Sequence, residues 1–254
     1  SAKQCILTNA DYPAECTNQV RDPKLFQMTD GTFRMVLGAW LQDDKGAVLL
    51  YSSTDLEHFT FEQLYTTEKA FGYMWECPDI FALDGHRILA VCPQGVPSEA
   101  EQYQNIYQSG YFIETEETRT VDASFKGTEE TRTVNPSFIE WDMGFDFYAP
   151  QTFETPAGRR ILIGWAGVPD AEYSSNPTNE GWQHSLTVPR ELRYDLRRIV
   201  AELVDVDVAA SFEMFKNFVK CRQSNLGRCA VVVAKSELSH FIRRHLLDMH
   251  VHAE

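Results

Sequence analysis

The pattern of hydrophobic and polar positions between Arg21 and Leu192 consists of short apolar runs separated by glycine-containing turns. Runs rich in β-branched and aromatic residues cover residues 32–41, 47–53, 86–93 and 159–165. They follow the turn sequences TDG, DDKG, LDG and TPAG. Short runs joined in this way predict antiparallel hairpins. We therefore expect an all-β fold, either a sandwich, a barrel or a propeller, and the recurrent spacing favours the propeller.

The region after Leu192 has a different pattern. Apolar side chains recur there at helical spacing, first at Val208, Phe212, Phe215 and Val219 and then at Leu238, Phe241, His245 and Met249. This spacing predicts two amphipathic helices. We therefore expect a partial β-propeller domain over residues 1–192 and an atypical, short helical C-terminal tail over residues 193–254.

One segment is nearly repeated. TEETRTVDASF at residues 115–125 returns as TEETRTVNPSF at residues 128–138. A single tandem pair is too short for a solenoid, which needs about three repeats. The duplication is typical of a lengthened surface hairpin without a chemical role, because long loops tolerate insertion.

Composition and charge narrow the range of partners. The chain has 254 residues, 43% of them hydrophobic, which suffices for a sizeable core. Its net charge of −14 would repel nucleic acid and anionic membrane surfaces. The longest apolar runs, such as residues 230–234, are far shorter than the roughly 20 residues that span a bilayer, and no leader pattern opens the sequence. We expect a soluble, cytoplasmic protein without nucleic-acid or membrane partners.

Cysteine and histidine patterns favour neither disulfides nor a metal. The 6 cysteines are scattered and show no CxxC spacing, so free thiols are expected. His245, His250 and His252 have no carboxylate or thiol at a ligand spacing, which indicates a solvated helix end. The sequence predicts no metal site and no cofactor.

A stretch with chemical potential is GYMWECPDIF at residues 72–81, where the ionisable Glu76 stands between Trp75 and Cys77. A carboxyl group in an apolar setting keeps its proton to higher pH, as a general acid near neutral pH must. The alternative is a strand whose faces alternate between interior and solvent, with Glu76 on the solvated face. These residues by themselves leave both interpretations open.

A second acidic position lies in QVRDPKLF at residues 19–26, where Asp22 stands between Arg21 and Pro23. The Arg21 guanidinium favours the ionised form of Asp22, and Pro23 favours an extended backbone there. One charged carboxylate and one protonated carboxyl divide the roles of glycoside hydrolysis. Candidate aromatic platforms and planar amides for a sugar are Trp75, Trp141, Tyr148, Gln151, Trp165 and Trp182. Composition alone favours a core position for each tryptophan.

Several motifs together resemble one known family over about residues 20–192. They are, in chain order, VRDPKLF, MVLGAW, GYMWECPDIF, YQSGYF, DMGFDFYAPQTF, GRRILIGWAG and HSLTVPREL. Their order and spacing are similar to those of the bacterial sucrose-6-phosphate hydrolases and invertases of glycoside hydrolase family 32. The resemblance implies a five-bladed β-propeller that hydrolyses terminal β-D-fructofuranosides with retention.

The resemblance also implies roles for individual residues. Glu76 matches the acid/base of the ECPD motif, and Asp22 matches the transition-state stabiliser of the RDP motif. Arg21 is then a sugar ligand, and Trp165 lines the fructose pocket. The other residues expected to contact substrate are Trp75, Cys77, Tyr148 and Gln151. We expect Cys77 to tune or pack the site and not to act as a nucleophile.

The sequence also departs from the family. Members carry the nucleophilic aspartate in a motif close to WMNDPNG, and this sequence contains no NDPN. We therefore expect an incomplete propeller that lacks the first blade, and little hydrolysis of sucrose by this chain alone. The alternative is a non-catalytic carbohydrate-binding propeller or an inactive fragment. The choice among sucrose, sucrose 6-phosphate and a fructan, the place of the nucleophile and the oligomeric state are left open.

Overall fold

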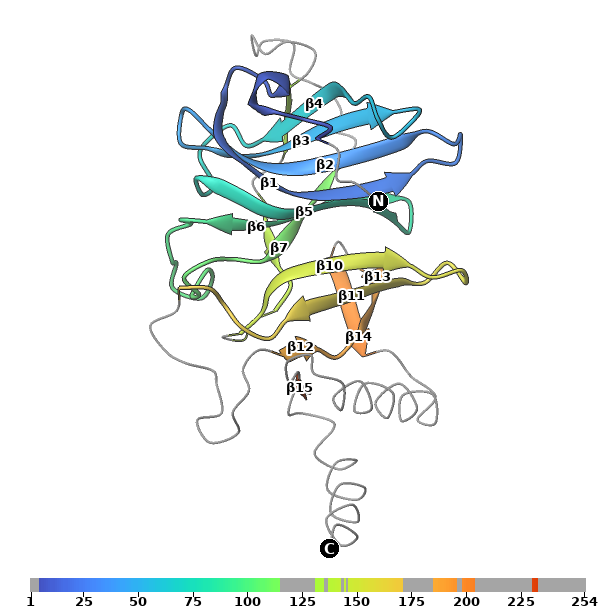
Figure 1. Ribbon diagram of the computed structural model, residues 1–254. Coiled ribbons are helices and arrows are strands. Elements are labelled where there is room, and N and C mark those ends of the chain that lie inside the picture. The colour runs from blue at the N-terminus through green and yellow to red at the C-terminus, as the bar shows by residue number, and fades with distance from the viewer. Residues whose placement is uncertain are drawn as a thin grey trace, which may run out of the picture.

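The elements that the computed structural model describes are almost all β-strands (Figure 1). The residues that it describes are 5–114, 131–134, 137–142, 144, 146–170, 185–195, 198–203 and 230–232. In these ranges the one helical element is the 3-10 turn η1 (Asn9–Asp11), and no helix is long and apolar enough to cross a membrane. The all-β prediction is confirmed for this part of the chain.

The first sheet gathers the N-terminal strands in sequence order. It runs β1 (Cys16–Gln27), β2 (Phe33–Leu41), β3 (Gly46–Ser53), β4 (Thr60–Thr66) and β8 (Thr131–Thr133). Neighbours pair antiparallel except β8, which runs parallel to β4. The hairpin between β1 and β2 turns at Gly31, whose φ of +87° is readily adopted only by glycine. The hydrophobic runs predicted as strands correspond to β2 and β3.

Two further sheets follow along the chain. The second has the order β5 (Met74–Leu83), β6 (His86–Gln94), β7 (Gly110–Glu114) and β9 (Ile139–Glu140). The third has the order β14 (Arg198–Leu203), β13 (Arg190–Asp195), β11 (Arg160–Trp165), β12 (Ser185–Thr187) and β15 (Ala230–Val232), and β10 (Tyr148–Glu154) also pairs with β11. The runs predicted at residues 86–93 and 159–165 correspond to β6 and β11.

One expectation needs correction. A helical tail from Arg193 is wrong for the residues that are described, because β13 continues to Asp195 and pairs antiparallel with β14. Both amphipathic helices expected in the tail, and its histidines, lie outside the described residues. So does most of the duplicated segment. The strands on either side of it, β7 and β9, pair antiparallel, as expected for a lengthened hairpin, and its one described strand, β8, pairs in parallel with β4.

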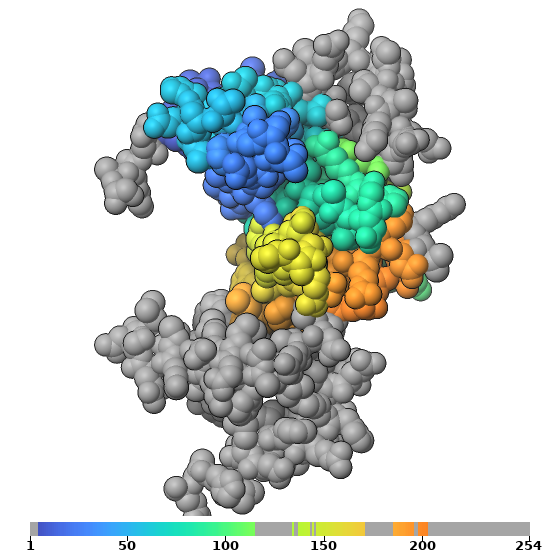
Figure 2. Space-filling model, turned by 90° about the vertical axis from the view of Figure 1, so that its right-hand side faces the viewer, coloured from blue at the N-terminus to red at the C-terminus, as the bar shows by residue number. Residues whose placement is uncertain are grey.

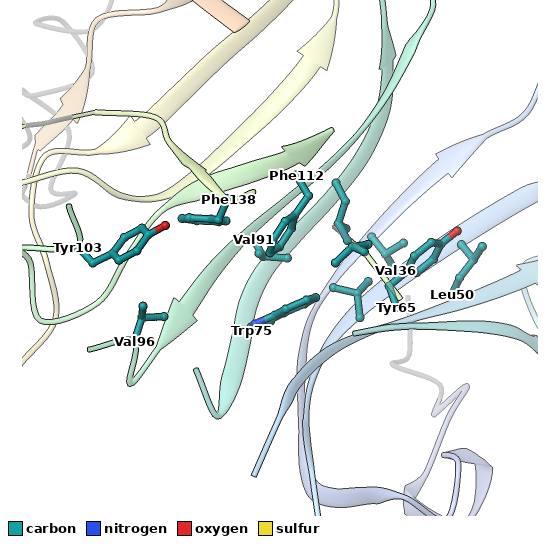
Figure 3. Close-up of a cluster of buried hydrophobic side chains, with 12 residues drawn as sticks. Val36, Leu50, Tyr65, Trp75, Val91, Val96, Tyr103, Phe112 and Phe138 are labelled. Atoms are coloured by element: carbon teal, nitrogen blue, oxygen red, sulfur yellow. The ribbon is translucent and has the colours of Figure 1, made fainter. Parts of the chain in front are cut away.

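A large apolar core lies between the first and second sheets (Figure 3). At its centre is Trp75 of β5, which is 0% exposed and packs against Phe112 with the rings tilted and their centroids 5.3 Å apart. Glycines of the first sheet make room for it, because a Cβ at Gly38 would collide with the Trp75 backbone and one at Gly46 with its ring. The other members of this core are Val36, Val48, Leu50, Tyr65, Leu89, Val91, Val96, Tyr103, Val134 and Phe138.

A second core joins the second sheet to the third, so that the three sheets stack in succession. It includes Ile88 and Tyr111 from the second sheet and Leu162 and Leu192 from the third. Figure 2 shows the sheets as adjoining layers, blue to cyan, then green, then yellow to orange. The first strand of the second sheet, β5, contacts the first strands of the other two, β1 and β10 (Figure 1). This is the arrangement of successive blades in a β-propeller.

Candidate active site

The strands β1, β5 and β10 share an interruption of their ladders. The pairing register shifts within Arg21–Lys24, Glu76–Asp79 and Tyr148–Gln151. In β5, for example, Glu76 pairs with Cys92 and Asp79 with Ala90, so three steps oppose two. This is a one-residue β-bulge, a device that re-aims side chains and is frequent beside active sites.

A sequence pattern that the motif analysis missed accounts for the three bulges. Each segment has proline third, and proline cannot donate to a ladder. The residue before it is left-handed in every case, with φ of +57° at Asp22, +49° at Cys77 and +47° at Ala149. The expected extended backbone at Asp22 is therefore wrong. The repeated proline in RDPK, ECPD and YAPQ would have revealed three equivalent sites.

Glu76 is held by polar partners from three strands. Its Oε2 accepts hydrogen bonds from the Tyr148 hydroxyl at 2.8 Å and from Gln94 Nε2 at 2.9 Å. Its Oε1 lies 3.4 Å from Arg21 Nε, and the Glu76 side chain is 16% exposed. The expected apolar setting is therefore wrong, because an arginine, an amide and a phenol surround the carboxylate. Sequence motifs did not identify Gln94, which no pattern distinguishes from an ordinary strand end.

Asp22 lies in the same site as Glu76. Its Oδ2 accepts a hydrogen bond of 2.9 Å from the backbone N–H of Cys77, the residue that follows Glu76. The Cys77 thiol lies 3.7 Å from the same oxygen. The bulges of β1 and β5 thus bring both predicted carboxylates together, although Glu76 comes 54 positions after Asp22 in the sequence.

Trp75 is not part of this site, which corrects the prediction that it contacts substrate. Successive side chains of a strand point to opposite faces, so Trp75 enters the core while Glu76 faces the site. Its indole N–H donates to the carbonyl of Phe71 at 2.8 Å, which satisfies the polar atom inside the core. Trp141, another candidate platform, is buried against Tyr111 with centroids 4.3 Å apart. Trp182 lies outside the described residues.

The remaining predicted residues do gather near Glu76. Trp165 pairs with Tyr148 across β10 and β11, and it packs against the small cluster that contains Cys92, Tyr148 and Val168. Gln151 Nε2 donates to the carbonyl of Cys77 at 3.3 Å. Their contact with substrate remains a prediction.

Two groups in the site are held in their neutral forms. Burial, reinforced by nearby acidic groups, raises the pKa of the Tyr148 phenol, so Tyr148 remains a hydrogen-bond donor to Glu76. A hydrogen bond with Cys92, followed by burial, raises the pKa of the Cys77 thiol. A thiol that resists ionisation is a poor nucleophile, which supports a packing role for Cys77. Among the described residues, no group of three or more His, Cys, Asp or Glu side chains could hold a metal ion.

Comparison with known proteins agrees with this geometry. Residues 1–202 match the family model described as "Glycosyl hydrolases family 32 N-terminal domain". The chain is 42% identical over 181 residues to a sucrose-6-phosphate hydrolase of Staphylococcus xylosus, covering 71% of this chain and 34% of the relative. It is 39% identical over 199 residues to a sucrose-6-phosphate hydrolase of Bacillus subtilis (strain 168), covering 76% and 39%. The chain thus spans between a third and two fifths of the length of these curated relatives.

Solved structures give the same result. A mutant β-fructofuranosidase of Bombyx mori in complex with sucrose superimposes with a TM-score of 0.65 at 32% identity, covering 77% of this chain and 39% of that one. A sucrose-6-phosphate hydrolase from Lactobacillus gasseri gives a TM-score of 0.62 at 30% identity, covering 76% and 38%. These neighbours are five-bladed β-propeller enzymes, so the predicted propeller fold is confirmed.

Proposed function

The chain belongs to glycoside hydrolase family 32, and from this membership we propose that its site serves the hydrolysis of terminal β-D-fructofuranosides, with sucrose or sucrose 6-phosphate as substrate. The observation that carries the proposal is the convergence of Glu76 and Asp22 through matching bulges in β5 and β1. Two carboxylates at one site are the basic requirement of glycoside hydrolysis.

Glu76 acts as the general acid and then as the general base. Its carboxyl donates a proton to the glycosidic oxygen as the bond to the fructosyl carbon breaks, and the leaving sugar carries that proton away. Arg21, 3.4 Å from Oε1, stabilises the carboxylate that remains. In the second step this carboxylate accepts a proton from the water that attacks the fructosyl carbon, and the bond between that carbon and the nucleophilic carboxylate breaks. Tyr148 and Gln94 orient it through Oε2 in both steps.

Asp22 supplies fixed negative charge to the positively charged transition state. The hydrogen bond from the Cys77 N–H fixes the direction of its carboxylate before substrate arrives. A charge that is already oriented costs little reorganisation during the reaction, which is why such groups are effective in catalysis. Asp22 would hold fructose hydroxyl groups in this role.

The retaining mechanism also needs a nucleophilic carboxylate about 5–5.5 Å from the acid/base. Asp79 is unsuitable, because it is 2% exposed and its Oδ2 is bound by Lys24 and Thr152. The proposal assigns the acid/base and stabilising roles to Glu76 and Asp22, and it assigns the nucleophile to no described residue.

The test is fructose release from sucrose and from sucrose 6-phosphate. It is measured for the chain alone and for the chain joined to an NDPN-containing segment of a related enzyme. In the active form, Glu76→Gln should lower kcat/KM by about 10²–10⁴-fold, the usual contribution of general acid–base catalysis. The matched control Glu68→Gln changes an exposed glutamate and should have no effect. If neither form releases fructose but the chain binds it in calorimetry, the alternative of a carbohydrate-binding propeller replaces this proposal.

A further inference from the structure

A buried polar network lies directly below the three bulges. Asp79 of β5 is 2% exposed, and its Oδ2 accepts hydrogen bonds from Lys24 Nζ of β1 at 2.5 Å and from the Thr152 hydroxyl of β10 at 2.7 Å. The Thr152 N–H donates to the same oxygen at 3.1 Å. Lys24 Nζ also donates to the Thr152 carbonyl at 2.6 Å. One carboxylate oxygen therefore ties together the first strands of all three sheets.

Two members of the network occupy corresponding positions in the repeated pattern, and the third lies one position later. Lys24 directly follows the proline of RDPK, and Asp79 directly follows the proline of ECPD. Thr152 is one residue beyond the end of YAPQ. The residues that these bulges aim at the site are Arg21, Asp22, Glu76, Cys77 and Tyr148. The network thus joins the three strands within four residues of each of these side chains.

Stability alone is a weak reason for such a network. Burial lowers the pKa of Lys24, against the opposing effect of Asp79, so the ammonium is held at a desolvation cost. Buried ion pairs are often replaceable by apolar pairs without loss of stability. What an apolar pair cannot reproduce is direction, because the carboxylate oxygen fixes its three donors at defined angles.

We propose that Lys24, Asp79 and Thr152 form a positioning lock that sets the spacing of the three bulges, and so holds Glu76 within hydrogen-bond reach of Tyr148 and close to Asp22. These are positioning residues, since they act on the reaction only through Glu76, Asp22 and Tyr148. The catalytic consequence rests on the proposed function, whereas the geometric one does not. A displacement of about 1 Å in a catalytic group can lower a rate by about 10²-fold.

The decisive variant is the neutral pair Lys24→Met with Asp79→Leu. Each single change leaves a buried charge without its partner and should lower the denaturation midpoint, and the double variant should recover it. The carboxyl ¹³C resonance of Glu76, assigned by its loss in Glu76→Gln, should nevertheless shift in the double variant. In the active form kcat should fall by about 10²-fold with KM little changed. Arg159→Met with Glu191→Leu neutralises a 2.7 Å ion pair at the far end of the third sheet and should leave the resonance unmoved.

If the double variant does not fold, variants of Thr152 test the positioning lock. Thr152→Ser keeps the hydroxyl and should preserve the Glu76 resonance. Thr152→Val removes the donor to Asp79, together with the long 3.4 Å hydrogen bond that the hydroxyl accepts from Arg160, and should shift the resonance. A wild-type resonance in the folded double variant, or in Thr152→Val, would overturn the lock. If the wild type releases no fructose in any form, the proposed function fails, and the resonance comparison still decides the lock because it needs no turnover.

Discussion

The two faces of strand β5 use neighbouring residues in opposite ways. On one face Trp75 is fully buried among aliphatic and aromatic side chains contributed by two sheets. On the other, Glu76 meets three polar partners from separate strands at the site. Packing on the face that carries Trp75 depends on side-chain volume and shape, which many apolar residues can provide. The site face depends on direction and charge, and it requires a left-handed residue and a proline in the strand.

This contrast teaches that the bulge separates two kinds of constraint. Before the bulge, side chains alternate between the two faces of the strand as in a regular sheet, and a substitution there should mainly lower stability. At the bulge, a strained backbone conformation is tolerated because it directs a side chain into the site. A substitution there should lower function more than stability. Substitutions on the two sides of the bulge should therefore separate a loss of stability from a loss of function.

The largest effect should come from Trp75→Ala. Truncating a buried tryptophan leaves a cavity between the first two sheets and should lower the free energy of unfolding by about 3–5 kcal/mol. Phe153→Ala on β10 is the control, since Phe153 is 50% exposed and its loss should cost about 0.5 kcal/mol or less. Urea denaturation measures both. Similar losses for the two variants would show that the interface between the sheets is not the main core.

Tyr148→Phe should affect the site face instead. It removes the hydroxyl that donates to Glu76 Oε2 and keeps the buried ring. A hydrogen bond to a charged acceptor is worth about 1.5–3 kcal/mol, so kcat/KM for fructose release in the active form should fall by about 10–100-fold. Tyr103→Phe makes the same change in the core between the first two sheets and should leave the rate unchanged. A slow Tyr103 variant would contradict the division between the two faces.

Ala149→Val tests the backbone of the third bulge. A β-branched residue is strongly disfavoured at the φ of +47° found there, so the variant should lose about 1–3 kcal/mol of stability. Ala82→Val introduces the same side chain at an exposed position in the regular part of β5 and should be neutral or slightly stabilising. Thermal unfolding of the two variants provides the comparison. Equal behaviour would mean that Ala149 does not hold a left-handed conformation in solution.

The smallest effect is expected at an exposed turn remote from both faces. The hydrogen bond that the His58 ring donates to the Asp55 carboxylate raises the pKa of His58 and lowers the pKa of Asp55. The His58 contribution to stability is present below its ordinary value of 6.5 and is lost as pH rises through its raised pKa. The contribution of Asp55 to stability is present above the ordinary Asp pKa of 3.8 and is lost as pH falls through the lowered pKa of Asp55. NMR titration of His58 should therefore give a midpoint above pH 6.5. Asp55→Asn should return this midpoint toward 6.5 and should leave Glu76-dependent turnover unchanged.

Much of the β-structure could be predicted from local patterns. The hydrophobic runs that follow the turns TDG and DDKG were sufficient to place the hairpins of the first sheet, because period-two alternation and turn chemistry act over a few residues. The same local reasoning failed beyond Leu192, where β13 and β14 form although a helical tail was expected. Pairing with a distant strand, β11, outweighs local propensity there.

The site was predicted in part. Motifs identified Glu76, Asp22, Arg21 and Tyr148, and the structure brings them together. They misassigned Trp75 because a motif records neighbours in sequence, and neighbours in a strand face opposite ways. They missed Gln94, since its role arises only from the pairing of β6 with β5.

Local sequence alone specified the strands β2, β3, β6 and β11, the turns before them and the three prolines that force a bulge, because these depend on steric rules within a few residues. The tertiary structure was needed to show that the three bulges lie together and that Trp75 lies in the core while Glu76 lies in the site. It was also needed to show that Lys24 and Thr152 donate to one carboxylate oxygen of Asp79. Those outcomes depend on which sheets pack together. Packing is a sum of many weak contacts between residues far apart in the chain, and no local pattern contains that sum.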